Sequence, residues 1–295
     1  MSRVHRWSLQ SPAKLNWSLR VLGKRADGFH QLHSLFVAAD LYDRLTLTLD
    51  APHLPRLEVD GLDAEQIPQD ERNLVLQAEA AWRQAGGEAP AVSWHLHKRI
   101  PAAAGLGGGS GNAAAALRLL QHVATQTPQQ SLVKIGAALG SDIPFFLGNG
   151  PVFLGGRGEE ILGTIPLFPQ RVILVAPPIE VATPSVFQAL AAPDYQAQTA
   201  PDLPLPSKWS SEAGPNDLLP AVLQASPNFA QFWQELQQIA PFHLSGSGGA
   251  CFLPQVSPQE SARLLPQCQD LCDYVWKLSC LTGPVLGVVH EHPES

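Results

Sequence analysis

The stretch PAAAGLGGGSGNAAAA, residues 101–116, decides how this chain folds and what it can bind. Five of its glycines fall within seven positions, from Gly105 to Gly111, and an alanine-rich segment follows directly. Glycine permits backbone conformations closed to other residues and lets a ligand approach the main chain closely. A glycine loop that opens into a helix aims several free N–H groups and the positive end of the helix dipole at one point. We therefore expect this loop to hold phosphate.

Neither of the two common glycine motifs for nucleotides fits this stretch. A Walker A loop needs a Lys after its last glycine, and no Lys follows any of these glycines. The dinucleotide fingerprint, started at Gly105, finds Ser110 where its last glycine should be. A flexible linker is the alternative, but Leu106 lies inside the run and residues 113–120 are strong helix formers. The sequence favours a phosphate loop of another kind.

The composition is that of an ordinary globular protein, with 45% hydrophobic and 15% charged residues among 295. A net charge of −7 without a Lys/Arg cluster argues against a nucleic-acid or membrane partner. The four cysteines lie between residues 251 and 280 and form no C-x-x-C pair, which favours free thiols over a metal site. No apolar run reaches the ~18 residues of a membrane span, and MSRVHRWSLQ does not resemble a signal peptide. We expect a cytoplasmic protein without a metal cluster of its own.

Hydrophobic periodicity predicts an α+β fold of two domains, residues 1–160 and 161–295, with the boundary near 155–165, although a single domain stays open. Strands are expected over residues 4–10, 15–22, 44–50 and 92–100, and helices over 73–85, 110–123 and 128–139. The second half should contain strands in VFLGG, in RVILVAP and over 274–279, and helices over 185–190, 217–224 and 229–239. Residues 191–215 are rich in Pro, Ser, Gln and Ala and should form an exposed loop or mobile segment.

Two polar residues fit phosphoryl transfer, which needs a phosphate cradle, a nearby cation and a group that orients or deprotonates the acceptor. Lys14, in SPAKLN, precedes an apolar strand and can neutralise charge on a phosphate, although a surface Lys is the simpler interpretation. Asp142, in GSDIPFF, can accept a proton if a Lys lies beside it. A helix cap or a turn is the simpler interpretation of that aspartate.

Three further segments offer candidate contacts. Phe29 and His30 end the turn RADGFH and could contact a base or a sugar, or be a core Phe beside a surface His. The segment LSGSGGA, residues 244–250, could pack a second backbone turn against phosphates, or form an ordinary tight hairpin. Asn216 and Asp217, before Leu218, are interpreted as a helix N-cap.

Together these segments resemble the three ordered motifs of the GHMP kinase superfamily: P-A-K-L-N, P-x-x-x-G-L-G-G-G-S and S-G-S-G-G. Within it the chain is similar to the 4-diphosphocytidyl-2-C-methyl-D-erythritol kinases, since D-G-F-H, G-S-D-I-P-F-F and N-D-L also fit and a G-E-H-like continuation is absent. The match spans residues 11–250 in order. The resemblance implies ATP-dependent phosphorylation of the 2-hydroxyl of a small-molecule cytidyl substrate on the methylerythritol phosphate route to isoprenoids. It further implies Mg²⁺ as a cofactor and a monomer or weak homodimer.

The resemblance also implies a GHMP kinase fold, with an N-terminal ribosomal-protein-S5-domain-2-like domain, a C-terminal ferredoxin-like domain and the substrate between them. Asp142 would take the proton of the 2-hydroxyl, and Lys14 would hold that aspartate and the transferring phosphoryl group. Phe29 and Phe187 would lie on the two faces of the cytosine, which His30 would hydrogen-bond. The substrate site would comprise Asn16, Phe29, His30, Thr183, Phe187, Gly246, Ser247 and Gly248. The ATP phosphates would be wrapped by Pro101, Ala102, Ala103, Ala104, Gly105, Leu106, Gly107, Gly108, Gly109, Ser110 and Gly111, with Ser110 close to Mg²⁺.

Two positions depart from the family pattern. Gly111 stands where relatives usually have a second Ser, so a hydroxyl contact near phosphate or Mg²⁺ should be missing. Phe29 stands where many have Tyr, so stacking should survive without a hydroxyl hydrogen bond. The alternatives are a homoserine or mevalonate type of kinase, a non-catalytic relative that senses a metabolite, and a structural nucleotide-binding module. The base site disfavours the first, and the presence of both Lys14 and Asp142 disfavours the second.

Overall fold

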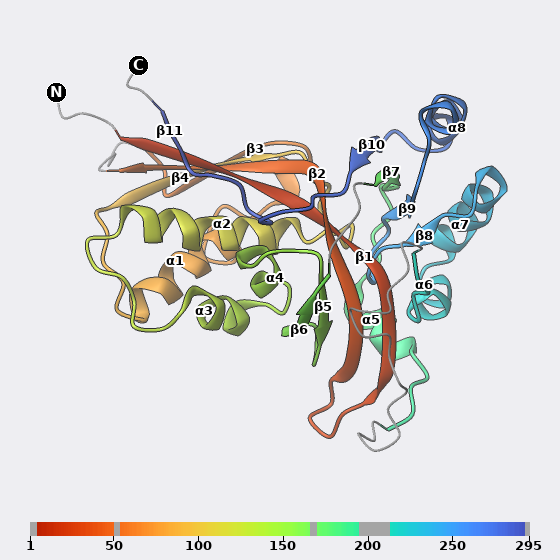
Figure 1. The fold of residues 1–295 in the computed structure, drawn as a ribbon, viewed down its shortest axis with the longest axis horizontal. Helices are drawn as coiled ribbons and strands as arrows, with labels where there is room; N and C mark the ends of the chain where they lie inside the picture. The colour runs from red at the N-terminus through yellow and green to blue at the C-terminus, as the bar shows by residue number, and fades with distance from the viewer. Residues whose placement is uncertain (1–4, 50–53, 166–169, 195–212, 293–295) are drawn as a thin grey trace.

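One long antiparallel hairpin runs through the computed structural model, which describes residues 5–49, 54–165, 170–194 and 213–292 (Figure 1). Its strands are β1 (Arg6–Lys24) and β2 (His30–Leu49). The prediction of two separate strands over residues 4–10 and 15–22 is wrong, because β1 is continuous from Arg6. Register shifts at Pro12/Ala13 and Asn16/Ser18 keep it paired with β2. A bulge of this kind accommodates a proline that cannot donate to the ladder.

The larger sheet has the strand order β11–β1–β2–β4–β3, and β5 pairs with β2 and β6. Its remaining strands are β3 (Leu57–Gly61), β4 (Val92–Lys98), β5 (Val152–Gly155), β6 (Glu160–Thr164) and β11 (His290–His292). A short 3-10 turn, η1 (Ala64–Gln66), follows β3. Figure 1 shows the helices of this half on one face of the sheet: α1 (Leu74–Gln84), α2 (Gly108–Val123), α3 (Leu132–Leu139) and α4 (Ile143–Leu147).

Side-chain caps fix the starts of two of these helices. The Asn73 side chain accepts the Val75 N–H at 2.9 Å, so α1 begins where the sequence predicts. Ser131 accepts the Lys134 N–H at 3.4 Å, and α3 therefore begins at Leu132 rather than near position 128. Such caps satisfy N–H groups that have no partner inside the helix.

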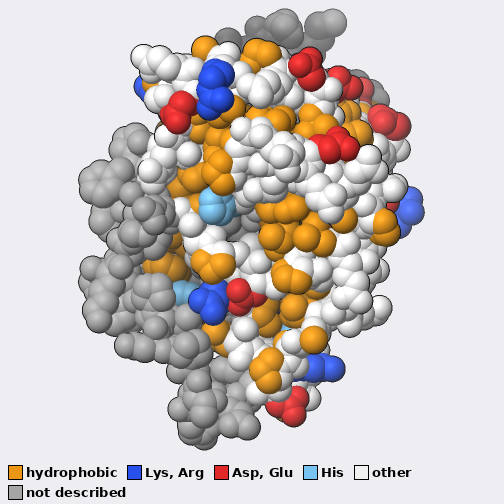
Figure 2. All heavy atoms as spheres, turned by 90° about the vertical axis from the view of Figure 1, so that its right-hand side faces the viewer, with side chains coloured by type: hydrophobic (Ala, Val, Ile, Leu, Met, Phe, Trp, Pro, Cys, Tyr) orange, Lys and Arg blue, Asp and Glu red, His pale blue; other side chains and the backbone are white. Residues whose placement is uncertain are grey.

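The smaller sheet has the strand order β10–β7–β9–β8. It comprises β7 (Arg171–Val175), β8 (His243–Leu244), β9 (Cys251–Leu253) and β10 (Val275–Ser279). The accompanying helices are α5 (Thr183–Ala189), α6 (Leu219–Ala225), α7 (Pro227–Ile239) and α8 (Pro258–Leu271). Figure 2 shows the end of the molecule where α6 to α8 lie; Lys and Arg side chains lie singly on this face.

The first half of β2 contributes to two hydrophobic cores. Phe36 and Ala38 pack in the core that includes residues of α2 and α4, whereas Leu35 and Val37 pack in the core that includes residues of the smaller sheet. Trp17 of β1 joins the second core, stacked on a ring of β9. A strand buried on both faces has no hydrophobic alternation. Periodicity therefore predicted only residues 44–50 of this strand.

The division of the chain between residues 160 and 161 stays a prediction. β6 still pairs with β5 in the larger sheet, and the chain returns to that sheet at β11. Most of the predicted exposed segment, residues 195–212, lies outside the described residues. None of the helices in the described part of the chain is long and apolar enough to cross a membrane.

Candidate active site

The glycine loop between β4 and α2 has a backbone shaped for close contact. Ala103, Gly105 and Gly107 have positive φ angles of 53°, 78° and 72°. Gly107 is the N-cap of α2, which begins at Gly108 rather than at the predicted Ser110, and glycine offers no side chain to cover the N–H groups of the first turn. Residues 101–110 line a cavity of about 350 Å³ at this helix start. Backbone N–H groups at a helix N-terminus suit a phosphate, so we refer to this space as the nucleotide cavity.

The predicted second glycine turn packs directly on this loop. The turn links β8 to β9, so it is a tight hairpin. It also contacts the first loop: a Cβ added to Gly248 would lie 2.4 Å from the backbone nitrogen of Gly105. The Ala250 N–H donates to the Ala104 carbonyl at 3.1 Å. Only glycine allows the two backbones to approach this closely. The hairpin interpretation of LSGSGGA is confirmed, whereas its contact with phosphates stays a prediction.

Gly111 lies elsewhere than the sequence suggested. It is buried and does not line the nucleotide cavity, whereas Ser110 does. A Cβ at position 111 would lie 2.3 Å from Ser11 Oγ and 3.2 Å from the Phe146 ring. Gly111 therefore belongs to the packing between α2 and β1, and the expectation that it removes a hydroxyl from the phosphate site is wrong for this chain.

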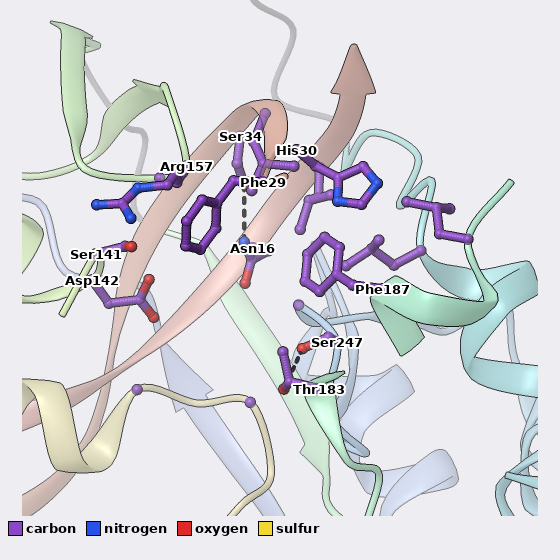
Figure 3. A pocket seen from close by; sticks show the side chains of 18 of the residues that line it. Asn16, Phe29, His30, Ser34, Ser141, Asp142, Arg157, Thr183, Phe187 and Ser247 are labelled. Carbon is purple, nitrogen blue, oxygen red and sulfur yellow. Dashed lines mark hydrogen bonds between the residues drawn. The ribbon is translucent and has the colours of Figure 1, made fainter. Parts of the chain in front are cut away.

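A second cavity of about 780 Å³ opens beside the loop, and we refer to it as the acceptor cavity (Figure 3). Gly105 and Gly107 line both cavities, so the two spaces meet at the glycine loop. Besides these two glycines, nine residues proposed from the sequence line the acceptor cavity: Lys14, Asn16, Phe29, His30, Asp142, Thr183, Phe187, Gly246 and Ser247. These residues come from β1, β2, α5 and three connecting segments, so the fold gathers them from distant parts of the sequence.

Lys14 is held in the wall of the acceptor cavity and is only 5% exposed. Its backbone N–H donates to the Leu106 carbonyl at 2.9 Å, which joins β1 to the glycine loop. Its Nζ donates to Asn16 Oδ1 at 2.6 Å and lies 3.6 Å from Asp142 Oδ2. Burial lowers the pKa of Lys14, and the neighbouring Asp142 opposes that shift. The simpler interpretation, a surface Lys, does not hold.

Asn16 connects Lys14 to both halves of the molecule. Its Nδ2 donates to Ser34 Oγ on β2 at 2.9 Å, and its backbone N–H donates to Ser245 Oγ at 3.1 Å. Because Ser245 belongs to the second glycine turn, Asn16 fixes the Lys14 ammonium relative to that turn.

Asp142 occupies the N-cap position of α4, yet its side chain makes no capping hydrogen bond within the described structure. Its carboxylate instead faces the acceptor cavity, as Figure 3 shows, with 29% of the side chain exposed. A carboxylate that reaches both a buried ammonium and a cavity is placed to accept a proton.

Aromatic side chains line the acceptor cavity away from the glycine loop (Figure 3). Phe29 is 51% exposed, whereas the rings of His30 and Phe187 lie together with centroids 5.2 Å apart. Desolvation, with Lys24 nearby, lowers the pKa of His30. A neutral imidazole at pH 7 has one donor and one acceptor nitrogen, which suits recognition of a polar ring.

Arg157 is a cavity residue that the sequence did not reveal. Its guanidinium lies over the Phe29 ring, with the central carbon 4.6 Å from the ring centroid. Figure 3 places it beside Ser141 and Asp142 as well. The residue sits in a glycine-flanked turn, GGRGEE, whose sequence carries no signal for a site.

Asn216 and Asp217 were interpreted as a helix N-cap, and this is wrong because Leu218 occupies that position before α6. Asn216 Oδ1 does accept the Leu218 N–H, at 3.0 Å. Its Nδ2 donates to the carbonyls of Leu244 and Gly246, at 3.0 and 2.8 Å. Asn216 therefore holds the second glycine turn, and Thr183 and Ser247 hydrogen-bond each other at 2.8 Å beside it.

Within the described residues, no three or more His, Cys, Asp or Glu side chains are grouped to hold a metal ion. The family model described as GHMP kinases N terminal domain matches residues 73–150. The chain is 36% identical over 253 residues to the 4-diphosphocytidyl-2-C-methyl-D-erythritol kinase of Paramagnetospirillum magneticum, a match covering 83% of this chain and 88% of that protein. The chain belongs to the 4-diphosphocytidyl-2-C-methyl-D-erythritol kinase family.

Solved structures agree with this family. A crystal structure of 4-(cytidine 5'-diphospho)-2C-methyl-D-erythritol kinase matches with a TM-score of 0.74 and 29% identity, covering 92% of this chain and 98% of that one. Homoserine kinase from Cytophaga hutchinsonii matches with a TM-score of 0.61 at 16% identity, covering 98% of each chain, and shows the fold alone. The predicted α+β GHMP kinase fold is confirmed.

Proposed function

We propose that this chain transfers the γ-phosphoryl group of ATP to the 2-hydroxyl of 4-diphosphocytidyl-2-C-methyl-D-erythritol, on the methylerythritol phosphate route to isoprenoids. One observation carries the proposal. The acceptor cavity contains Lys14 and Asp142 and meets the nucleotide cavity at Gly105 and Gly107, while two aromatic rings and a histidine line it farther from the loop. Membership of the kinase family supports the same conclusion.

The chemistry assigned to these residues is direct transfer. Asp142 accepts the proton of the 2-hydroxyl while that oxygen forms its bond to the γ-phosphorus. The bond from this phosphorus to the oxygen that bridges to ADP breaks, and ADP leaves with the electron pair. The Lys14 side chain packs against Gly107 of the glycine loop. Its ammonium therefore offers positive charge to the negative charge that develops on the transferred phosphoryl group. No covalent phospho-enzyme is required.

The residues of the nucleotide cavity are compatible with a Mg²⁺ ion that arrives bound to ATP. Mg²⁺ commonly takes only one or two protein oxygens together with phosphate oxygens and water, so a cluster of carboxylates is not needed. The Ser110 hydroxyl, at the start of α2 in the wall of the nucleotide cavity, is the protein oxygen that we assign to it. When bound, the ion would neutralise charge on the ATP phosphates.

The residues proposed to recognise the cytosine base distinguish this function from the alternative kinase and sensor functions. Homoserine and mevalonate have no nucleobase, so kinases for those acceptors gain nothing from Phe29, His30 and Phe187. A metabolite sensor has no need for the buried Lys14 beside Asp142. Cytoplasmic location, a monomeric or weakly dimeric state and the absence of nucleic-acid binding remain predictions from the sequence.

An assay of ADP release tests the proposed function. The protein with Mg²⁺ and ATP should release ADP rapidly only when 4-diphosphocytidyl-2-C-methyl-D-erythritol is added, and homoserine and mevalonate should leave the rate at background. Equal rates with and without the cytidyl acceptor would contradict the proposal.

Phe29→Ala is expected to raise the KM for the cytidyl acceptor about tenfold or more, because stacking on a base contributes about 1–3 kcal/mol. The KM for ATP should stay unchanged, since Phe29 does not line the nucleotide cavity. Steady-state kinetics with each substrate varied in turn measure both constants. Phe29→Tyr is the matched control, because it keeps the ring and should bind the acceptor normally. An unchanged acceptor KM in Phe29→Ala would rule out stacking.

A further inference from the structure

A buried carboxylate lies beneath the glycine loop and is not explained by the proposed chemistry. Asp43, on β2, has no exposed surface. Its Oδ1 accepts the backbone N–H groups of Arg99 and Ile100, at 2.8 and 2.9 Å. Its Oδ2 accepts the Lys98 ammonium and the Asn112 side-chain amide, the latter at 3.0 Å. One side chain therefore satisfies four donors.

These donors come from both sides of the loop. Lys98 ends β4, and the Arg99 and Ile100 N–H groups directly precede Pro101. Asn112 lies in α2, just past the last glycine of the run. Asp43 thus ties the segments on both sides of the loop to β2 of the long hairpin.

The same cluster touches the first turn of α2. A Cβ added to Gly108 would lie 3.1 Å from Lys98 Nζ and 3.4 Å from Asp43 Oδ2. Lys98 and Asn112 both line the nucleotide cavity, although they are only 3% and 2% exposed. The Asn112 amide nitrogen must face the carboxylate, because a carboxylate only accepts. Its Oδ1 is buried and has no hydrogen-bond partner among the residues that the structure describes.

We propose that Asp43 is a positioning residue for ATP: it holds the glycine loop, Lys98 and Asn112 in the arrangement that the nucleotide phosphates require. Fixing a loop before the ligand arrives removes the ordering cost from binding. Ala103 has a positive φ angle of 53°, which is unfavourable for a residue with a side chain and persists only where the surroundings hold it. The glycines of the loop lose much conformational freedom when they are ordered, so fixing them in advance favours binding. The proposal rests on the proposed use of ATP and is independent of which acceptor the enzyme phosphorylates.

Asp43→Asn tests the proposal with little change in shape. The Asn oxygen can still accept from the Arg99 and Ile100 N–H groups, but its amide nitrogen then faces two donors, Lys98 and Asn112. We expect the dissociation constants of ATP and ADP, measured by calorimetry with Mg²⁺ and no acceptor, to rise about tenfold or more. The KM for the acceptor should stay within about twofold of wild type. Unchanged nucleotide affinity in the folded variant, or an equal rise in the acceptor KM, would overturn the proposal.

Glu79→Gln is the matched control. Glu79, in α1, is another buried carboxylate and is 6% exposed. It accepts hydrogen bonds from Trp94 Nε1 and Arg83 Nε, at 2.9 Å each. It does not line the nucleotide cavity, so its loss should lower the melting temperature while leaving ATP and ADP affinity unchanged. If Glu79→Gln weakens nucleotide binding as much as Asp43→Asn does, the effect is general destabilisation and the proposal fails.

Asn112→Ala keeps the test decisive if Asp43→Asn does not fold, since breaking a buried ion pair is strongly destabilising. This change removes the α2 tether together with the Asn112 amide in the cavity wall, and it leaves Lys98 paired with Asp43. ATP and ADP affinity should fall about three- to tenfold with the acceptor KM unchanged. Wild-type nucleotide affinity in Asn112→Ala would overturn the proposal. Because nucleotide binding is measured without acceptor, a wrong acceptor assignment would leave this result intact.

Discussion

Asp142→Asn is expected to lower kcat about 10²- to 10⁴-fold, the usual effect of losing a general base. This corresponds to about 3–5 kcal/mol in the activation barrier. The substituted amide has the shape of the carboxylate but takes no proton at neutral pH. Because the Asp142 side chain does not cap α4 in the described structure, the substitution should leave that helix start intact. The KM for ATP should change little.

Single-turnover ADP formation at saturating substrates measures this effect without interference from product release. Asp270→Asn, on the exposed side of α8, is the matched control and should leave the rate unchanged. Near-wild-type turnover in Asp142→Asn would remove Asp142 from the mechanism.

Lys14→Met is expected to lower kcat about 10²- to 10³-fold, the scale found when one charge-stabilising donor is removed from a reaction centre. Met is apolar and similar in length, so it can occupy the space of the Lys14 side chain, a residue that is only 5% exposed. The change removes the cation that lies 3.6 Å from Asp142 and leaves Asn16 Oδ1 without its donor. Lys277→Met, on the exposed side of β10, should have no effect on kcat. Turnover within a few-fold of wild type in Lys14→Met would contradict the assignment.

The pH dependence of kcat gives Lys14 a second readout. Burial lowers the pKa of Lys14 from the usual 10.5, so the wild-type rate should fall as pH rises through that lowered value and the ammonium loses its proton. Asp142 raises the pKa of Lys14, so without its charge that pKa should fall further. The residual kcat of Asp142→Asn should therefore decline with rising pH at a lower pH than the kcat of wild type does. If the alkaline decline of kcat in Asp142→Asn occurs at the same pH as in wild type, or at a higher pH, a group other than Lys14 titrates.

The sequence predicted the glycine loop, the helix after it and the Lys14–Asp142 pair because those features depend on local residue types and motif order. It missed the first half of β2, since Leu35 to Ala38 are buried on both sides and show no alternation. Arg157 could not be recognised, because its position over Phe29 depends on contacts between distant segments.

Asp43 did leave a signal in the sequence. It falls in phase with Leu45 and Leu47, on the buried side of the alternating strand. A carboxylate at such a position needs donors when it is buried. The phase alone predicts that Asp43 is buried. Its donors could be identified only from the fold, because they come from the end of β4, the two residues after it and α2.

The long hairpin has a mechanical consequence. β1 contributes Leu9 to the core that includes residues of α2 and α4, and Leu15 to the core that includes residues of the smaller sheet. It contributes Leu19 to a third core, which includes residues of α6 and α7. One strand is therefore held by packing at three points along its length. Rotating one half of the molecule against the other would bend two paired strands and disturb all three cores at once. The enzyme should therefore behave as a stiff frame, in which substrates enter a preformed site and only side chains and short turns adjust around them.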